Sequence, residues 1–319
     1  MTTPTIYYSE SYDISMLGME KLHPFDSRKS SRSLAKIRSA LGKQAETLLR
    51  TPQTSSTRDV LELVHSRGYL ENLRRSRVIA KALELWCLSF VPATALDRGI
   101  LLPMRWVVQG TIEAAKSAML HGAAINLGGG YHHAHRDRGE GFCIYADVPV
   151  AIEALRRDGV LSSAAHIAII DLDAHRGNGF ESIYDSDPNI HFFDMYNFQV
   201  YPGRLKDRSE RHEDIRSLRA YMDDTGYFNV LKGHLPNFLR KHSYSIVFYN
   251  AGTDVLSGDP VGRFGLSRQA VLDRDRFVVE AIEQIGVPWV MVPSGGYTVE
   301  SHELLADTVS WVCGRHGRE

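Results

Sequence analysis

Hydrophobic and polar positions follow two different rhythms along this chain. Short runs of apolar and β-branched residues predict four buried strands, at 123–127, 167–172, 245–250 and 287–292. Longer amphipathic segments alternate with them and predict helices at 106–120, 148–157, 267–284 and 298–312. Continuous apolar strands that alternate with helices are typical of a parallel sheet covered on both faces.

The pattern therefore predicts an α/β fold with one central, mostly parallel sheet and helices on both faces. Residues 1–100 are interpreted as a layer of helices and loops. The segment 201–226 mixes charges with few apolar residues and is expected to be surface loop. Because no repeat or linker composition divides the chain, residues 1–319 are predicted to form a single domain.

Composition narrows the class of protein without identifying its chemistry. With 43% hydrophobic and 24% charged residues, a chain of 319 residues can bury one large core. A formal net charge of -1 provides no overall basic field, so neither nucleic acid nor an anionic membrane is expected as a direct partner. No stretch is long and apolar enough for a membrane span.

The cysteines and the first residues bear on the compartment. Cys87, Cys143 and Cys313 are odd in number and widely spaced, which favours free thiols in a reducing compartment. Residues 1–10 have neither the basic start nor the apolar run of a signal peptide. We therefore expect a cytoplasmic protein. Its oligomeric state stays open, and a monomer is compatible with the sequence.

Polar residues gather where the predicted strands end, which is where ligands bind in open parallel sheets. Asp171, Asp173 and His175 follow Ile170, and their alternation in an extended segment would place them on one face. Asp254 follows the next strand in a loop that contains glycine. Asp173, His175 and Asp254 can then bind one cation and leave positions open for water and substrate, as a catalytic zinc requires.

A simpler interpretation is that each of these polar residues caps a neighbouring helix, and for any one of them alone it would be preferred. The set argues otherwise, because two acids and a histidine on one face of an apolar strand are costly to bury without a metal or a network of partners. The sequence therefore favours a metal site. The oxygen-rich donor set would accept iron(II) as well as zinc, so the native metal stays open.

A loop after the first predicted strand supplies candidates for proton transfer. Residues 128–135 read Gly-Gly-Gly-Tyr-His-His-Ala-His, and consecutive glycines let the backbone approach a ligand closely. We assign His132 and His133 to acid and base chemistry, since histidine exchanges protons near neutral pH. His135 is interpreted as structural.

A further loop ends in a tyrosine. Tyr297 follows Gly295 and Gly296 directly after the last predicted strand. Simple packing explains an isolated tyrosine of this kind. Beside a metal, its phenol would instead donate a hydrogen bond to a carbonyl oxygen that is becoming an oxyanion.

These loops, in this order, closely resemble those of the zinc-dependent histone deacetylase family. The similarity covers nearly the whole chain, and the matching segments look like the class IV branch, the histone deacetylase eleven type. The segments are 22–26, 128–145, 169–179, 201–203, 249–260 and 294–297. The resemblance implies an arginase/deacetylase-type catalytic domain with zinc on Asp173, His175 and Asp254.

The resemblance also implies roles for the residues around the metal. His132 and His133 would form a tandem acid/base pair, with Asp171 orienting His132 and Tyr297 stabilising the transition state. An acyl-lysine channel would be walled by Gly141, Phe142, Tyr201, Gly295 and Gly296.

A second cation is a further implication of the resemblance. In the family a monovalent ion, usually potassium, lies beside the zinc-binding loop. It would sit here between the Asp171 side chain and the backbone of Asp173 and His175, with Asp194. Several of its ligands are carbonyls, which sequence does not specify.

The chain departs from many relatives after the metal-binding histidine. Arg176 and Asn178 stand where other branches have a second histidine and an aspartate. Asn178 looks like the class IV pattern. A neutral amide there changes the orientation and basicity expected of His133.

The predicted function is hydrolysis of acyl groups from lysine side chains of proteins or peptides. Class IV relatives are associated with long fatty acyl groups, and a fitting apolar cavity would favour each buried methylene by about 0.8 kcal/mol. The segments 22–25 and 128–130 are the expected lining of that cavity.

Three alternatives differ in what they require. A binuclear manganese ureohydrolase would need acids where this chain has Gly177 and Gly252. A non-enzymatic acyl-lysine binding module would be expected to have lost a metal ligand or Tyr297, and none is missing. An acetylpolyamine or other small-amide deacetylase would use the same machinery and stays open.

Overall fold

Eight parallel strands form the frame of the protein in a computed structural model that describes residues 3–15, 18, 20, 23–203 and 214–315. Their order across the sheet is β2-β1-β3-β8-β7-β4-β5-β6, and every neighbouring pair is parallel. The strands are β1 (Thr5–Tyr7), β2 (Leu49–Arg50), β3 (Ala123–Asn126), β4 (His166–Asp171), β5 (Ile190–Asn197), β6 (Ile215–Leu218), β7 (Tyr244–Asn250) and β8 (Trp289–Val292).

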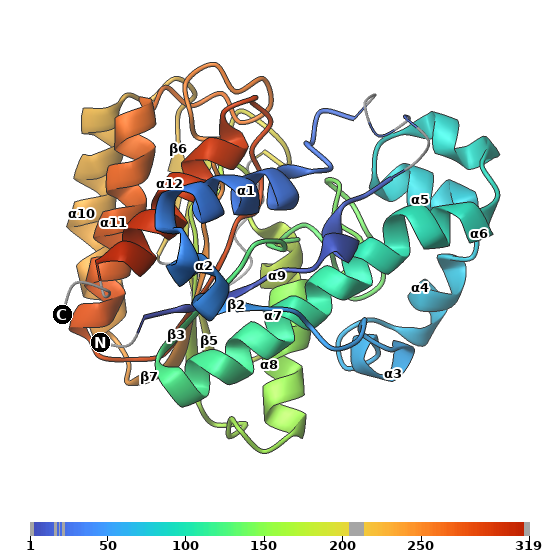
Figure 1. Cartoon of the computed structure of the whole chain (residues 1–319), viewed down its shortest axis with the longest axis horizontal. Coiled ribbons are helices and arrows are strands. Elements are labelled where there is room, and N and C mark those ends of the chain that lie inside the picture. The colour runs from blue at the N-terminus through green and yellow to red at the C-terminus, as the bar shows by residue number, and fades with distance from the viewer. Residues whose placement is uncertain (1–2, 16–17, 19, 21–22, 204–213, 316–319) are drawn as a thin grey trace.

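Helices cover both faces of this sheet (Figure 1). One apolar core joins the sheet to α1 (Lys29–Leu41), α2 (Lys43–Leu48), α10 (Asp224–Arg240), α11 (Arg268–Gln284) and α12 (Ser301–Gly314). A second core on the other face involves α3 (Arg58–Leu61), α4 (Arg67–Asn72), α5 (Ser76–Ala82), α6 (Ala93–Leu96), α7 (Leu102–His121), α8 (Asp147–Arg157) and α9 (Asn178–Ile183). Short helical segments are η1 (Glu10–Tyr12), η3 (Trp86–Phe90) and η4 (Asp97–Leu101).

The central strands are apolar along their whole length because both of their faces are buried. In β4, Ile167 and Ile169 belong to one core, whereas Ala168 and Ile170 belong to the other. All four side chains are completely buried. The predicted α/β fold with a parallel sheet and helices on both faces is thus confirmed, and the four predicted strands and four predicted helices are all present.

Several strands were not predicted. The expectation of only helices and loops in residues 1–100 is wrong, because β1 and β2 lie at one edge of the sheet. With three and two residues, they are too short to show a pattern. β5 contains polar residues at His191, Asp194 and Asn197, which interrupt its apolar run. β6 falls in the segment expected to be loop, of which 204–213 lies outside the described residues.

The sheet brings four loops together at one edge. β3, β8, β7 and β4 are consecutive neighbours and run in the same direction, so their carboxyl ends lie side by side. The loops that follow them contain the residues singled out in the sequence. The candidate chemistry therefore collects at the carboxyl edge, as expected for an open α/β sheet.

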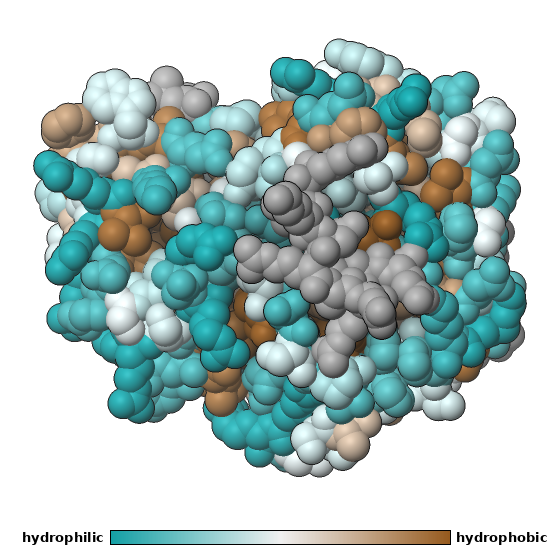
Figure 2. Space-filling view, turned by 180° about the vertical axis from the view of Figure 1, so that it is seen from behind, coloured by the Kyte–Doolittle hydropathy of each residue, from teal (hydrophilic) through white to brown (hydrophobic). Residues whose placement is uncertain are grey.

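Helix length and surface hydropathy bear on whether any of the described residues could cross a membrane. Among these residues, no helix combines the length and the apolar character needed to cross a bilayer. On the face shown in Figure 2, hydrophilic residues predominate and hydrophobic ones form small, separate groups.

A buried histidine ties the loop after β3 to the start of α8. His65 is 2% exposed, and its Nδ1 donates to the carbonyl of His135 at 2.9 Å. Its Nε2 accepts from the amide of Ala146 at 3.0 Å, so the two contacts require the neutral ring. Burial lowers the pKa of His65 to about 4.

This histidine should make the fold sensitive to acid. We expect the free energy of unfolding to fall as the pH drops from about 6.5 to about 4, because unfolded His65 accepts a proton that the folded state excludes. His65→Gln should be less stable at pH 7 by about 1–3 kcal/mol and should show a shallower decline. Urea unfolding at several pH values measures both. His234→Gln, at an exposed position of α10, should keep the wild-type slope, and an unchanged slope in His65→Gln would contradict this account.

Candidate active site

The three predicted metal ligands meet at the carboxyl ends of β4 and β7. His175 Nδ1 lies 3.0 Å from Asp173 Oδ1 and 2.9 Å from Asp254 Oδ2. All three side chains are buried, and one ligand atom from each lies within 4.8 Å of the others. The structure therefore brings together a set that the sequence places 81 positions apart at its extremes.

The path of the chain through this loop differs from the extended segment that was expected. β4 ends at Asp171, and the backbone bends from Asp173 onward. The amide of His175 donates to Asp173 Oδ1 at 2.9 Å, and this local turn directs both side chains to one point. The carboxylate of Asp171 is not part of this cluster and contacts His132 instead.

The electrostatics of the cluster fit a divalent cation. Burial, together with the charge of Asp173, raises the pKa of Asp254 to about 7. Burial opposes charge on His175, but Asp173 and Asp254 outweigh it and raise the pKa of the ring to about 10. Two buried carboxylates thus compete for one shared positive charge. A metal ion would satisfy both at once, and two oxygens with one imidazole nitrogen are suitable ligands for zinc.

The β8 loop closes over these carboxylates. Asp173 Oδ2 accepts from the hydroxyl of Ser294 and the amide of Gly295, both at 2.8 Å. A Cβ atom at Gly295 would lie 2.6 Å from oxygens of Asp173 and Asp254. Only glycine permits this approach.

A buried lysine holds the same loop from behind. Lys29, at the start of α1, is 2% exposed, and its Nζ donates to the carbonyls of Pro293, Ser294 and Gly295 at 3.3, 3.0 and 2.8 Å. Burial lowers its pKa to about 8, against the opposing effect of Asp254. Sequence reasoning missed Lys29, because nothing local distinguishes it from a solvated lysine.

A buried arginine holds the loops that follow β4 and β7. Arg274 of α11 donates to the carbonyls of Leu172 and Gly252 at 2.9 and 2.7 Å. Its remaining donors reach Asp275. Sequence reasoning also missed this pair, although Arg274 and Asp275 fall on the same helical face as the buried Val271 and Val278, which is a detectable signal.

The tandem histidines lie beside the metal-ligand cluster in two different environments. His132 Nδ1 is 2.8 Å from Asp171 Oδ2, and Asn250 donates to the other oxygen of Asp171 at 2.8 Å. Burial opposes a charge on His132, but Asp171 and Asp173 outweigh it and raise its pKa to about 9. His132 is therefore suited to carry a positive charge.

His133 has a neutral partner instead. Its Nδ1 lies 2.6 Å from Asn178 Oδ1, and the Asn178 amide group donates to Glu140 Oε1 at 2.8 Å. Because Glu140 only accepts, Asn178 must direct its oxygen at His133, so Nδ1 of His133 donates and Nε2 keeps its lone pair. Burial and the neighbouring His132 lower the pKa of His133 well below its usual value.

Glu140 connects the hydrogen-bonded pair of His133 and Asn178 to residues outside the site. It accepts from Arg138 Nε at 3.0 Å and lies 2.7 Å from His135 Nε2. His135 also contacts Ser182, and these two contacts fit the structural interpretation given to it. Sequence reasoning missed Glu140, which appears there only as an acid between two glycines.

A cavity leads from the surface to the histidines and the metal-ligand cluster. It encloses about 1090 Å³, counted to its open mouth, and its lining includes Gly141, Phe142, Gly295 and Tyr297. The lining also includes His132, His133 and Asp173. Its inner wall is apolar, formed by Tyr12, Ile14, Leu83, Leu85, Leu88, Ile100, Met104, Val107 and Leu127.

Two of the expected channel residues are not among those that line this cavity in the described part of the chain. A Cβ atom at Gly296 would meet the hydroxyls of Thr253 and Ser301 at 2.0 Å, so this glycine faces the protein and not the cavity. Tyr201 is 41% exposed and packs edge-on against His133, with ring centroids 5.0 Å apart. Neither belongs to the cavity lining in the described part of the chain.

The lining expected near the amino terminus is partly present. His23 and Phe25 line the cavity, as do Gly128, Gly129 and Gly130. Leu22 lies outside the described residues.

Aromatic rings form the wall next to the ligand cluster. The Phe142 ring packs edge-on against those of His23 and Tyr297, at centroid distances of 4.2 and 6.0 Å. The ring of Tyr297 lies 6.3 Å from that of His175. Burial and the charges of Asp173 and Asp254 raise the pKa of Tyr297 well above its usual value, so its phenol keeps its proton. A Cβ atom at Gly141 would lie 2.3 Å from the His133 ring, which explains the glycine there.

A second group of oxygens lies behind the cluster. Asp194 is paired with Asp171 in the register of β4 and β5, and its Oδ2 accepts from the amide of Gly177 at 2.9 Å. Its Oδ1 is buried and has no hydrogen-bond partner among the described residues. Burial and the neighbouring Asp171 raise the pKa of Asp194 well above its usual value.

Comparisons with known proteins agree with this geometry. A model of the histone deacetylase domain matches residues 23–313. The chain is 38% identical to histone deacetylase 2 of Arabidopsis thaliana over 306 residues, which cover 96% of this chain and 77% of that protein. It is 28% identical to human histone deacetylase 1 over 185 residues, covering 56% of this chain and 36% of that protein.

Solved structures give the same fold. The crystal structure of the HDA15 HD domain aligns with a TM-score of 0.79 at 17% sequence identity, over 100% of this chain and 91% of that one. The likeness at this identity concerns the fold alone. Since the family model spans most of the sequence, this chain belongs to the histone deacetylase domain family.

Proposed function

We propose that this protein is a zinc-dependent hydrolase that removes acyl groups from lysine side chains of proteins or peptides. The observation that carries the proposal is the buried cluster of Asp173, His175 and Asp254 beside two histidines with opposite charge preferences, at the inner end of an open cavity. Membership of the histone deacetylase domain family supports the same reaction class.

Asp173, His175 and Asp254 would hold the zinc. A bound zinc ion supplies Lewis acidity, which polarises an acyl carbonyl and acidifies a water molecule. His133 is the general base, because its Nε2 keeps a free lone pair while Nδ1 donates to Asn178. After the amide bond breaks, His133 returns the proton to the leaving lysine amine.

His132 and Tyr297 provide the charge balance for this step. His132, paired with Asp171, supplies a fixed positive charge beside the reacting carbon. Tyr297 keeps its proton and donates a hydrogen bond to the acyl oxygen as negative charge develops on it. Phe142 and Gly141 form the wall along which the lysine stem lies.

A monovalent cation, most simply potassium, is the second proposed ion. Asp194 Oδ1 is buried without a partner in the described part of the chain and Asp171 lies beside it, so two carboxylates compete for positive charge. An oxygen-rich site of this kind suits a hard cation.

The apolar inner wall extends the proposal to long acyl chains. An acetyl group needs little room, whereas the lining of the cavity also includes leucines, Ile100, Met104 and Val107. Together with Asn178, this wall supports placing the chain in the class IV branch. An acetylpolyamine substrate would gain nothing from an apolar wall and serves as the comparison substrate in the tests below.

The assignment of the metal ligands predicts that a ligand substitution removes zinc, whereas a substitution of Tyr297 lowers the rate alone. Asp254→Asn and His175→Ala should each lose the zinc of this site and all deacylase activity, because only two protein ligands remain there. Tyr297→Phe should keep its zinc and lose on the order of a hundredfold in kcat, the usual scale for one oxyanion donor. Metal content and turnover of an acetyl-lysine peptide measure these outcomes. A zinc content in Asp254→Asn equal to that of the wild type, or two equivalents of manganese with ureohydrolase turnover, would exclude the proposal.

The hydrogen bond between His133 and Asn178 predicts how the rate depends on pH. Asn178→Asp places a negative charge beside Nδ1 and favours the imidazolium, so the acidic limb of the kcat/KM profile should move to higher pH. Glu140→Gln should lower kcat at unchanged zinc content, because the Asn178 side chain is then free to turn and present its amide group to His133.

A double variant provides the control. In Asn178→Asp/Glu140→Gln both oxygens at position 178 accept, so the orientation of that side chain no longer matters, and the amide group introduced at position 140 can donate to it. Its activity should exceed that of Glu140→Gln alone. Equal activity in the two would show that Glu140 acts only through folding.

The cavity predicts a preference for long acyl groups. Burial of only two additional methylenes gives about tenfold in affinity, so kcat/KM for myristoyl-lysine should exceed that for acetyl-lysine by roughly tenfold or more. Met104→Trp should fill the inner wall, remove this preference and leave acetyl-lysine turnover nearly unchanged. Peptides of increasing acyl length and acetylspermidine form the panel. Efficiency that declines steadily beyond acetyl, or a preference for acetylspermidine, would contradict the proposal.

A further inference from the structure

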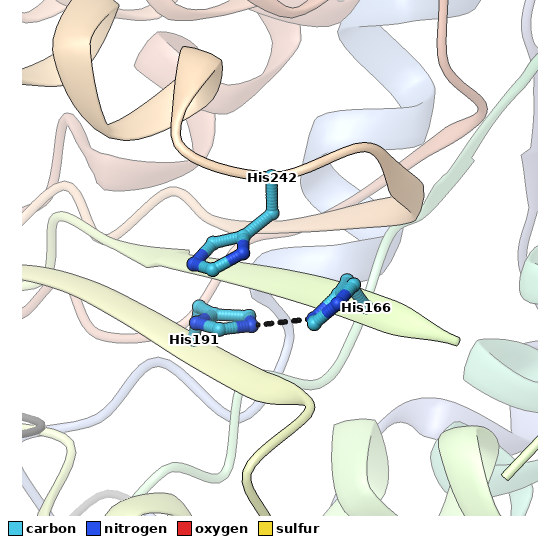
Figure 3. Close-up of side chains that lie close together, drawn as sticks. All are labelled: His166, His191 and His242. Atoms are coloured by element: carbon cyan, nitrogen blue, oxygen red, sulfur yellow. Dashed lines mark hydrogen bonds between the residues drawn. The ribbon is translucent and has the colours of Figure 1, made fainter. Parts of the chain in front are cut away.

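Three histidines meet at the amino edge of the sheet, opposite the candidate active site (Figure 3). His166 is the first residue of β4, His191 is the second of β5, and His242 lies in the turn between α10 and β7. Asp171, at the other end of β4, is about 16 Å further along the strand. The cluster is therefore separate from the catalytic machinery.

The three rings are in close contact. His166 Nδ1 lies 2.9 Å from His191 Nε2. The His191 and His242 rings are stacked with centroids 3.9 Å apart, and those of His166 and His242 are 4.7 Å apart. One nitrogen from each ring lies within 4.8 Å of the others, and all three residues are half-buried.

The register of the strands brings the three histidines together. The register of β4 against β7 shifts between His166 and Ile167, an irregularity of the kind that redirects side chains. His191 is paired with Ala168, whose small side chain leaves space beside the imidazole. The ring of Tyr244 lies 5.7 Å from His191 and forms part of the surrounding wall.

The ring nitrogens have few partners. Apart from the contact between His166 and His191, no hydrogen bond from the described residues reaches any of the three imidazoles. The neighbouring acids have other partners, since Asp214 accepts from Lys241 at 2.6 Å and Asp187 from Arg156 at 2.7 Å. Four of the six ring nitrogens are thus without a protein partner in the described part of the chain.

The cluster also disfavours protonation. Burial, followed by the charges of His242 and His166, lowers the pKa of His191 to about 4. Burial, followed by His166 and Lys241, lowers the pKa of His242. Both rings are neutral at pH 7, which is the form that binds metals.

We propose that His166, His191 and His242 form a second metal site, which takes a borderline divalent transition metal such as Zn²⁺, Ni²⁺ or Cu²⁺. An all-imidazole donor set selects these ions over Mg²⁺ and Ca²⁺, which prefer oxygen. Three ligands leave a fourth position to water, which the half-buried location can supply.

Binding requires a modest rearrangement. Nitrogen ligands on tetrahedral zinc are about 3.3 Å apart, so the stacked rings of His191 and His242 must turn toward one another. His242 lies in a turn and not in a strand, which gives this ligand the freedom to move. The bound metal would join the amino ends of three adjacent strands, β7, β4 and β5, and it would stabilise the folded sheet.

Measuring zinc per chain in proteins with and without the Asp254→Asn substitution tests the second site. Chelator-treated protein is loaded with Zn²⁺, freed of excess metal and analysed for zinc per chain. The wild type should hold two equivalents, and Asp254→Asn and His242→Ala one each. The double variant should hold none. His234→Ala, an exposed histidine of α10 outside the cluster, should behave as the wild type.

The Asp254→Asn background separates this inference from the proposed active site. In that protein, Ni²⁺ or Zn²⁺ should still raise the melting temperature, and the spectrum of bound Cu²⁺ should show coupling to several nitrogens. His242→Ala should weaken this binding by on the order of tenfold or more, the scale on which even outer partners of metal ligands act. Absence of metal binding in Asp254→Asn, or binding there that His242→Ala leaves unchanged, would overturn the proposal.

Discussion

Two buried carboxylates that share one imidazole impose the main constraint on this structure. Asp173 and Asp254 are at most 1% exposed and lie on either side of His175. Charges at this depth cost several kcal/mol each to desolvate unless every oxygen finds a partner. Asp254 Oδ1 accepts from the amide of Ala174, and Asp173 Oδ2 accepts from the β8 loop. Satisfying these oxygens draws the loops after β4, β7 and β8 onto one point.

The same constraint explains the buried cations behind the site. Nζ of Lys29 and Nη1 of Arg274 donate to backbone carbonyls, and the other donors of Arg274 reach Asp275 and not the carboxylates of Asp173 and Asp254. They therefore hold the loops in place and offset negative charge while leaving the carboxylates available for a metal. Asp147 holds a further loop through its backbone amides. It accepts from the amides of Gly130 and Tyr131 and so fixes the loop that carries the tandem histidines.

Adjacent histidines acquire opposite properties from partners that come from different strands and loops. Asp171 at the end of β4 stabilises a charged His132, whereas Asn178 at the start of α9 presents only a neutral oxygen to His133. Glu140 fixes that oxygen by accepting from the other end of the same amide. The carboxylate of Asp171 thus favours the charged form of His132, whereas His133 has no such partner, and burial and the charge of His132 lower its pKa.

The sequence by itself determined the alternation of strands and helices, the carboxyl edge as the site, and the set Asp173, His175 and Asp254. These are properties of contiguous segments, because apolar runs and the polar residues that end them are visible locally. Only the tertiary structure decided the roles of Glu140 and the buried cations, the inward turn of Gly296, and the meeting of the three histidines at the amino edge. Each of these depends on burial or on contacts between residues far apart in the chain, and a charged or polar side chain carries no local mark of either.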